Sequence, residues 1–238
     1  MPDNRTAIVT GAQQGIGFGL VYGFLKSGYN VVATSLHASK SLTPTSNLVV
    51  VDGDISDQET AAKTAEAAVT YFGTVDVLVN NAGIFITKPF TEFTTDDFNA
   101  LVSVNLLGFL HMTQLAVSQM LKQRSGCVIT ISAALADNPI AGVNGSLSMI
   151  TKGGLNTVTR HLAIEYAKQG VRFNAVAPGV VDTPLNQENP KDLLRALQPL
   201  GSIAEVSDIV DAVLYLAHAP QVTGEVLHVD GGAHGGRW

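Results

Sequence analysis

A glycine-rich segment near the start of the chain contains the residue types of a phosphate-binding loop. Gly11, Gly15 and Gly17 follow an apolar run at residues 6–9 and come directly before a helical pattern. Glycine permits a tight turn and a close approach of backbone to a pyrophosphate, and the first helical amides would face that charge. The spacing G-x3-G-x-G differs from the G-x-G-x-x-G fingerprint. Its position between a strand and a helix therefore favours dinucleotide binding over a plain turn.

A second candidate site follows the apolar run at residues 75–79. The sequence there is Asn80-Asn81-Ala82-Gly83. Open α/β sheets bind ligands at the carboxyl ends of their strands, where these residues would lie. Asparagine side chains can hold neighbouring backbone or a ribose, and the alternative interpretation of the motif is an ordinary turn.

Short apolar runs that alternate with helical patterns would position both motifs. The runs predict strands at residues 6–9, 30–34, 48–51, 75–79, 127–131, 172–177 and 225–229. Such continuous runs are typical of strands buried on both faces, as in a parallel sheet. The alternation extends over the whole length. We therefore expect one doubly wound α/β domain over residues 1–238, with a parallel sheet of about seven strands and helices on both faces.

Helix signals support this order of elements. Residues 56–59 have the spacing of a capping box, and Gly73 would follow the helix that they open. Residues 202–205 repeat that spacing before the last helix, and residues 94–97 are a weaker version. Residues 35–47 are too polar for a predicted helix. Residues 183–200 contain three prolines and predict a loop with one short helix around Leu193.

Composition excludes several classes of protein. The 238 residues include 14 Lys+Arg and 20 Asp+Glu, a net charge of −6, and 46% are hydrophobic. The acidic balance argues against a nucleic-acid-binding protein. Apolar runs fall short of the ~18 residues that span a bilayer, so no membrane segment is expected. The single cysteine, Cys127, suggests a reducing compartment, and the six histidines show no metal-ligand spacing. We expect a cytoplasmic protein without a metal.

The order of motifs resembles the short-chain dehydrogenase/reductase family, of the small single-domain type. The resemblance covers essentially the whole chain. It rests on residues 10–17, Asp54-Ile55, Asn80 to Gly83, Asn105, Lys152, Asn174, Pro178-Gly179 and Thr183. It implies hydride transfer between a nicotinamide cofactor and a small carbonyl or alcohol substrate. The cofactor-binding positions that it implies are Gly11, Gln13, Gln14, Gly15, Ile16, Gly17, Ser35, Asp54, Ile55, Asn81, Ala82, Gly83, Lys152, Pro178, Gly179, Val181 and Thr183.

The catalytic positions depart from the family pattern of Asn, Ser, Tyr and Lys. Asn105 and Lys152 match, but Ser148 stands four residues before Lys152, where the family has tyrosine. Ala133 stands at the usual serine position, and Ser132 could take that role. An aliphatic hydroxyl is a far weaker acid than a phenol with its pKa near 10.

Three alternatives for the chemistry stay open. Ser148 or Ser146 relays a proton from Lys152 or water, so that the chain is a working but atypical reductase. Another group, such as Lys152 itself, supplies the proton. In the third alternative hydride transfer is lost, and the chain is a weak or inactive NADP-binding module with a sensing or assembly role.

The segment after the second predicted strand predicts the choice of nucleotide. Residues 33–40 contain no acid that would bind a ribose 2′-hydroxyl and repel a 2′-phosphate. Ser35, with Thr34, His37 or Lys40, could hold the phosphate. Gln14 stands where NADP-preferring relatives often have arginine. We expect NADP, with NAD as the alternative.

The family resemblance also implies self-association. Members usually form tetramers through two long helices and the last strand, here residues 98–122, 154–168 and 225–229. The low charged content of 14% leaves much neutral surface, which agrees with that assembly. We expect a homotetramer or a homodimer, with Trp238 at a subunit contact.

Overall fold

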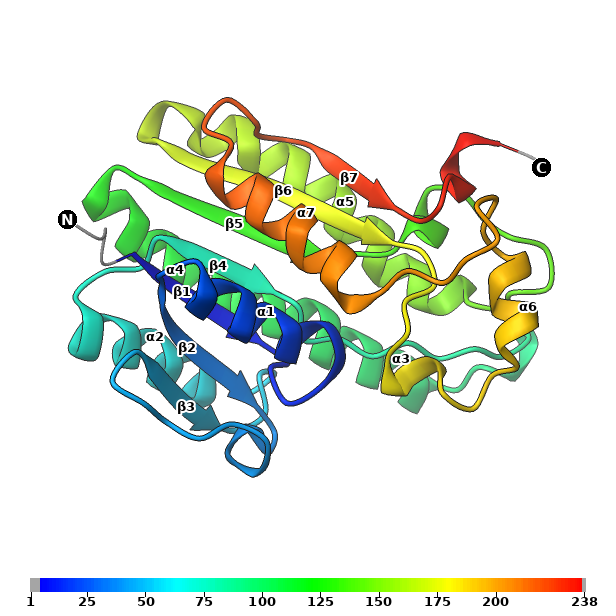
Figure 1. The fold of residues 1–238 in the computed structure, drawn as a ribbon, viewed down its shortest axis with the longest axis horizontal. Coiled ribbons are helices and arrows are strands. Elements are labelled where there is room, and N and C mark those ends of the chain that lie inside the picture. Colours follow the sequence, from blue (N-terminus) through cyan, green and yellow to red (C-terminus); the bar gives the residue numbers. More distant parts are fainter. Residues whose placement is uncertain (1–4, 237–238) are drawn as a thin grey trace.

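The computed structural model describes residues 5–236, and within this range seven strands form one sheet (Figure 1). The strand order is β3-β2-β1-β4-β5-β6-β7, and every neighbouring pair is parallel. The strands are β1 (Thr6–Thr10), β2 (Asn30–Ser35), β3 (Leu48–Asp52), β4 (Val77–Asn80), β5 (Gly126–Ile131), β6 (Val171–Pro178) and β7 (Val226–Val229). The order reverses between β1 and β4. Ligands of open α/β sheets bind at such a reversal.

Residues 5–236 form seven α-helices, and five of them cover the two faces of the sheet (Figure 1). They are α1 (Gly15–Lys26), α2 (Gln58–Phe72), α3 (Thr95–Leu101), α4 (Gly108–Gln123), α5 (Ser146–Tyr166), α6 (Lys191–Ala196) and α7 (Val206–His218). Helices α1 and α7 pack on one face, and α2, α4 and α5 on the other. The short α6 lies beyond the carboxyl edge of the sheet (Figure 1).

The two faces of each strand contribute to two separate cores. In β1, Ile8 points into the core under α2 and α4, and Val9 points into the core under α1 and α7. Both residues are fully buried. Burial on both faces explains why the strands are continuous apolar runs rather than alternating ones.

All seven predicted strands are confirmed, with ends shifted by one or two residues. Gly73 ends α2 in the left-handed conformation, with φ of 80°, as its position predicted. The capping box predicted at residues 202–205 is wrong. Helix α7 begins three residues later because Glu205 and Asp208 form the box instead. The short helix α6 confirms the prediction around Leu193.

Helices α3 and α4 form one continuous helical run from Thr95 to Gln123 through a π-helical turn, Val102–Leu107. This run is long and apolar enough to span a membrane by length and composition alone, with a mean hydropathy of 1.5 over its most apolar window. Its residues Met112, Ala116 and Met120 are fully buried against the sheet. The contacts of these residues with the sheet account for the apolar character of the run, which covers one face of the sheet. Trp238, predicted at a subunit contact, lies outside the described residues.

Candidate active site

The glycine-rich turn between β1 and α1 has the backbone of an anion-binding loop. Gly11 and Gly15 have positive φ angles of 65° and 54°. A Cβ atom at Gly17 would lie 2.1 Å from the carbonyl oxygen of Gly11, so only glycine allows α1 to start this close to the turn. Among residues 5–236 no side chain caps α1 at Gln14, and its first turn carries no acid. Its first amides are thus available to a phosphate, and the turn fits the pyrophosphate of a dinucleotide.

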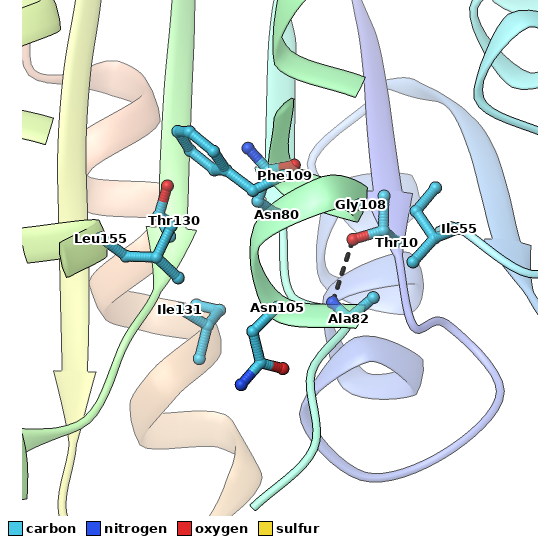
Figure 2. A pocket seen from close by; sticks show the side chains of 10 residues that line it. All are labelled: Thr10, Ile55, Asn80, Ala82, Asn105, Gly108, Phe109, Thr130, Ile131 and Leu155. Carbon is cyan, nitrogen blue, oxygen red and sulfur yellow. Dashed lines mark hydrogen bonds between the residues drawn. The ribbon is translucent and has the colours of Figure 1, made fainter. Parts of the chain in front are cut away.

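Thr10 joins the glycine-rich turn to the end of β4. Its Oγ1 accepts hydrogen bonds from the main-chain amides of Asn81 and Ala82, each at 3.0 Å; Figure 2 shows the Ala82 contact. The Asn81 side-chain amide donates to the carbonyl oxygens of Thr10 and Gly11 at 2.9 and 3.1 Å. The two sequence motifs are therefore one structural unit. Sequence reasoning assigned Thr10 no role of its own, and its place directly before Gly11 was the available signal.

Three of the predicted cofactor-binding residues, Ser35, Asp54 and Ile55, lie at or directly after the ends of β2 and β3. The Oδ1 atom of Asp54 accepts hydrogen bonds from the amide and the hydroxyl of Ser56 at 2.9 and 2.7 Å. Ile55 is buried beside it. Gln13 extends from the glycine-rich turn, and its Oε1 accepts a hydrogen bond from the amide of His37 at 3.2 Å. This contact connects the glycine-rich turn to the loop after β2. Ile16, by contrast, packs against the core.

Asn105 is held in the π-helical turn between α3 and α4. Its Oδ1 accepts from the amide of Ile84 at 2.8 Å, and its Nδ2 donates to the carbonyl of Ile84 at 3.1 Å. The same Nδ2 donates to Thr151 Oγ1 at 2.9 Å. π-helical turns occur frequently at functional sites, because the wider turn redirects side chains. Asn105 therefore joins the segment after β4 to the first turns of α5.

A cavity of about 10 Å³ lies beside Asn105, between the carboxyl ends of β1, β4 and β5 (Figure 2). Thr10, Asn80 and Thr130 are polar residues in its wall. The volume corresponds to about one water molecule. It is too small for a cofactor or a substrate.

Lys152 is buried in α5 with its ammonium group beside Gly83. Its Nζ donates to the carbonyl oxygen of Ile131 at 2.8 Å. A Cβ atom on Gly83 would lie 3.0 Å from this Nζ and 3.2 Å from Asn105 Oδ1, so Gly83 leaves the space that both side chains need. Burial lowers the pKa of Lys152 from 10.5 to about 8. The structure thus brings together three predicted site residues, Gly83, Asn105 and Lys152, at the sheet edge.

Ser148 does not join this group through a hydrogen bond. Its side chain is fully buried, and its Oγ accepts from the amide of Ile86 and donates to the carbonyl of Ile86, both at 2.9 Å. The hydroxyl proton is therefore already donated to a main-chain oxygen. In this arrangement Ser148 fixes the segment after β4, and nothing in the described residues supports its predicted relay of a proton from Lys152.

Ser132, predicted to take the role of the family's serine, also faces the main chain. Its amide and its Oγ donate to the carbonyl of Val176, at 2.8 and 3.4 Å. Ala133 follows it at the end of β5 and offers no hydroxyl. Within residues 5–236 neither Ser132 nor Ser148 is hydrogen-bonded to Lys152. Lys152 is accordingly the titratable group that the structure places at this end of the site.

The predicted loop after β6 closes the site from the other side. Gly179 donates its amide to the carbonyl of Val229 at 2.9 Å, and Val181 is buried. A Cβ atom at Gly15 would meet Thr183 at 3.4 Å, so the loop touches the glycine-rich turn. Pro178, the last residue of β6, positions the loop at the sheet edge. No cluster of three or more metal-ligating side chains lies in the part of the chain that the structure describes.

Comparison with known proteins gives matches over nearly the whole chain. The family model described as enoyl-(acyl carrier protein) reductase matches residues 11–234. L-xylulose reductase of Mesocricetus auratus is 35% identical over 241 residues, which cover 96% of each protein. The solved structure of ElxO with NADP bound has a TM-score of 0.91 and 29% identity, and the match covers 98% of this chain and 100% of that one. A 3-ketoacyl-(acyl-carrier-protein) reductase from Brucella melitensis, complexed with NADH, gives the same four values.

Proposed function

Because the chain belongs to the short-chain dehydrogenase/reductase family, we propose that it is an NAD(P)-dependent oxidoreductase acting on a small carbonyl compound or the corresponding alcohol. The observation that carries this proposal is the position of Lys152 Nζ, buried beside Gly83 and Asn105 at the sheet edge that the glycine-rich turn shares. Burying an ammonium whose one protein partner is a main-chain carbonyl is costly, and proton transfer in addition to cofactor binding accounts for this cost.

The cofactor is NADP, with NAD as the alternative. The glycine-rich turn, Thr10 and Asn81 supply the pyrophosphate end, and Ser35, Asp54 and Ile55 the adenosine end. Lys152 and the loop at Pro178, Gly179, Val181 and Thr183 supply the nicotinamide end. Support comes from the NADP and the NADH in the two similar solved structures. The absence of an acid between positions 33 and 40 favours NADP.

In carbonyl reduction, the chain itself has to provide the proton that the carbonyl oxygen takes up. A reduced nicotinamide held by Lys152 and the loop after β6 would supply a hydride to the carbonyl carbon, and the π-electron pair of the C=O bond would move to oxygen. The Lys152 ammonium provides the proton that this oxygen takes up, directly or through one water, and the resulting amine recovers a proton from bulk water. Its pKa of about 8 suits this task near neutral pH.

Asn105 and Ser148 act as positioning residues in this mechanism. Both hold the main chain after β4, at Ile84 and Ile86, by accepting from the amide and donating to the carbonyl of one residue. Gly83, beside Lys152, directly precedes that segment. A fixed segment keeps Lys152 in one environment, which sustains its lowered pKa.

We further propose a cytoplasmic homotetramer. Helices α4 and α5 expose apolar side chains, among them Leu110, Ile150 and Ile164, of which Ile164 is 80% exposed. Leu110 and Ile164 lie in the segments through which family members assemble, and Ile150 lies on the first turns of α5.

Stopped-flow absorbance of NADPH with a panel of ketones and aldehydes tests the proposed activity. We expect single-turnover oxidation of NADPH by at least one carbonyl, and none with Lys152→Ala. Tight NADPH binding by calorimetry without oxidation by any compound of the panel, in the native chain and in Ser148→Tyr, would contradict the proposal.

A further inference from the structure

The loop after β2 contains a carboxylate that comes from the neighbouring strand. Ser35 at the end of β2 pairs in register with Asp52 at the end of β3. The Oδ1 of Asp52 accepts the amide hydrogen of Ser39 at 2.8 Å, and its other oxygen accepts the Ser39 hydroxyl. Asp52 and Ser39 are both exposed to solvent. A fixed negative charge therefore lies at the open edge of the sheet, beside Ser35.

This loop is where a doubly wound dinucleotide fold distinguishes the two nicotinamide cofactors. An acid there binds the ribose 2′-hydroxyl, and a cation there accommodates a 2′-phosphate. Positions 35–40 contain Lys40 and no acid, which by itself favours the phosphate. The contact of Gln13 with His37 keeps the loop against the glycine-rich turn, and so at the cofactor end of the molecule. Asp52, at the end of β3, adds to this loop the negative charge that residues 35–40 do not contain.

Asp52 is charged at physiological pH, and its hydrogen bonds to Ser39 stabilise the charged form further. They are the main cause that lowers the pKa of this carboxyl from 3.8, and His37 adds a smaller effect. The same bonds occupy two donors, the Ser39 amide and hydroxyl, that could otherwise serve a phosphate oxygen. Both effects oppose a 2′-phosphate, whereas a 2′-hydroxyl is uncharged and can donate to a carboxylate.

We propose that Asp52 is a specificity-determining residue that weakens binding of the 2′-phosphate of NADP, so that the preference for NADPH over NADH is smaller than the loop sequence alone implies. A like charge opposite the phosphate costs affinity without affecting the rest of the nucleotide. The inference rests on the proposed function, because it requires a dinucleotide at this edge. It adds to that function a residue that limits the preference for NADP.

Asp52→Asn tests this inference, because asparagine keeps an acceptor oxygen for Ser39 and removes the charge. Calorimetric titrations would compare NADPH with NADH, and 2′,5′-ADP with ADP, which lacks the 2′-phosphate. We expect NADPH and 2′,5′-ADP to bind ~10-fold more tightly to the variant than to the native chain. NADH and ADP should change less than about twofold.

Glu59→Gln is the matched control, because it removes one exposed charge on α2 that pairs with Lys63. It should leave all four affinities unchanged. Circular dichroism checks the fold of each variant, and Asp52→Ser serves as a second variant because serine also keeps an oxygen that can accept from Ser39.

An unchanged ratio of NADPH to NADH affinity in both Asp52 variants would overturn the inference, while binding of ADP would leave the proposed function standing. If the native chain bound neither ADP nor either dinucleotide, the proposed function would fail, and this inference with it.

Discussion

The hydroxyl of Ser148 and the peptide of Ile86 form a closed pair, in which the hydroxyl accepts from the amide and donates to the carbonyl at 2.9 Å each. The two residues are 62 positions apart in sequence and join α5 to the segment after β4. Ser148, predicted to stand at the position of the family's catalytic tyrosine, thus has a structural partner. This pairing favours Lys152, as proposed above, as the source of the proton.

Ser148→Ala should reduce stability more than it reduces catalysis. The substitution leaves the buried amide and carbonyl of Ile86 without their partner, which costs about 1–3 kcal/mol of unfolding free energy. The rate of hydride transfer per folded molecule should stay within about threefold, because the hydroxyl transfers no proton. Urea unfolding and stopped-flow absorbance measure the two quantities.

Ser118→Ala is the matched control for this substitution. The Ser118 hydroxyl donates to Gln114 on the exposed side of α4, so its loss should cost less than about 0.5 kcal/mol. A Ser148→Ala variant with native stability and abolished hydride transfer would restore the serine relay and contradict Lys152 as the proton donor.

The rate of carbonyl reduction should fall as pH rises through about 8, the lowered pKa of Lys152. Only the ammonium form can donate a proton. The rate of reduction should therefore be at its maximum well below pH 8 and should decline above it. Alcohol oxidation should show the opposite trend, since it requires the neutral amine. Rates that follow pH alike in both directions would argue against proton transfer by Lys152.

Lys152→Met should stabilise the folded chain while it abolishes turnover. Burial disfavours the ammonium, and methionine removes this penalty, which is about 3 kcal/mol at pH 7 for the lowered pKa of Lys152. The native chain releases the Lys152 proton near pH 8 and the unfolded chain near 10.5, so the stability of the native chain rises with pH between these values. The advantage of the methionine variant, measured by urea unfolding, should therefore shrink over the same range. A less stable Lys152→Met at pH 7 would contradict the burial penalty.

Gly17→Ala should abolish cofactor binding. The added Cβ would lie 2.1 Å from the Gly11 carbonyl and would displace the turn or the start of α1. Gly154→Ala is a control in another helix, where a Cβ meets no atom within 4 Å among the described residues. The control should bind NADPH normally and be stabilised by about 0.5–1 kcal/mol. Equal affinities for the native chain and Gly17→Ala would remove the turn from the binding site.

Ile164→Asp should shift the oligomer to a smaller species. Ile164 is 80% exposed on α5, and a carboxylate there would have to be buried in an interface formed by this helix. Light scattering at micromolar concentration measures the molar mass. A monomeric native chain, or an unchanged mass in the variant, would contradict the tetramer.

The sheet could be predicted from the sequence because its strands carry their own signal. Runs such as residues 6–9 and 30–34 are apolar at nearly every position, and burial on both faces demands that pattern. The start of α7 could not be placed, because the choice between Ser202 and Glu205 as cap depends on where the preceding loop leaves the sheet. Capping signals of this kind predict that a helix is present more reliably than they predict its first residue.

The site could be predicted only as far as local motifs extend. Gly17 and Lys152 belong to patterns that keep a fixed spacing within one turn or one helix. Ser148 meets Ile86, and Asp52 meets Ser39, across separate elements, so their partners follow from tertiary packing alone. Sequence reasoning accordingly named Ser148 but not what it holds, and it missed Asp52.

Deuteride transfer from cofactor to product tests the central claim most directly. The native chain would be mixed in a single turnover with NADPH carrying deuterium at the transferred position and with the most reactive carbonyl of the panel. Mass spectrometry then determines whether deuterium is bound to the carbinol carbon. We predict deuterated alcohol from the native chain and from Ser148→Ala, and none from Lys152→Ala at saturating cofactor. Full transfer by Lys152→Ala, together with none by Ser148→Ala, would contradict proton donation by Lys152.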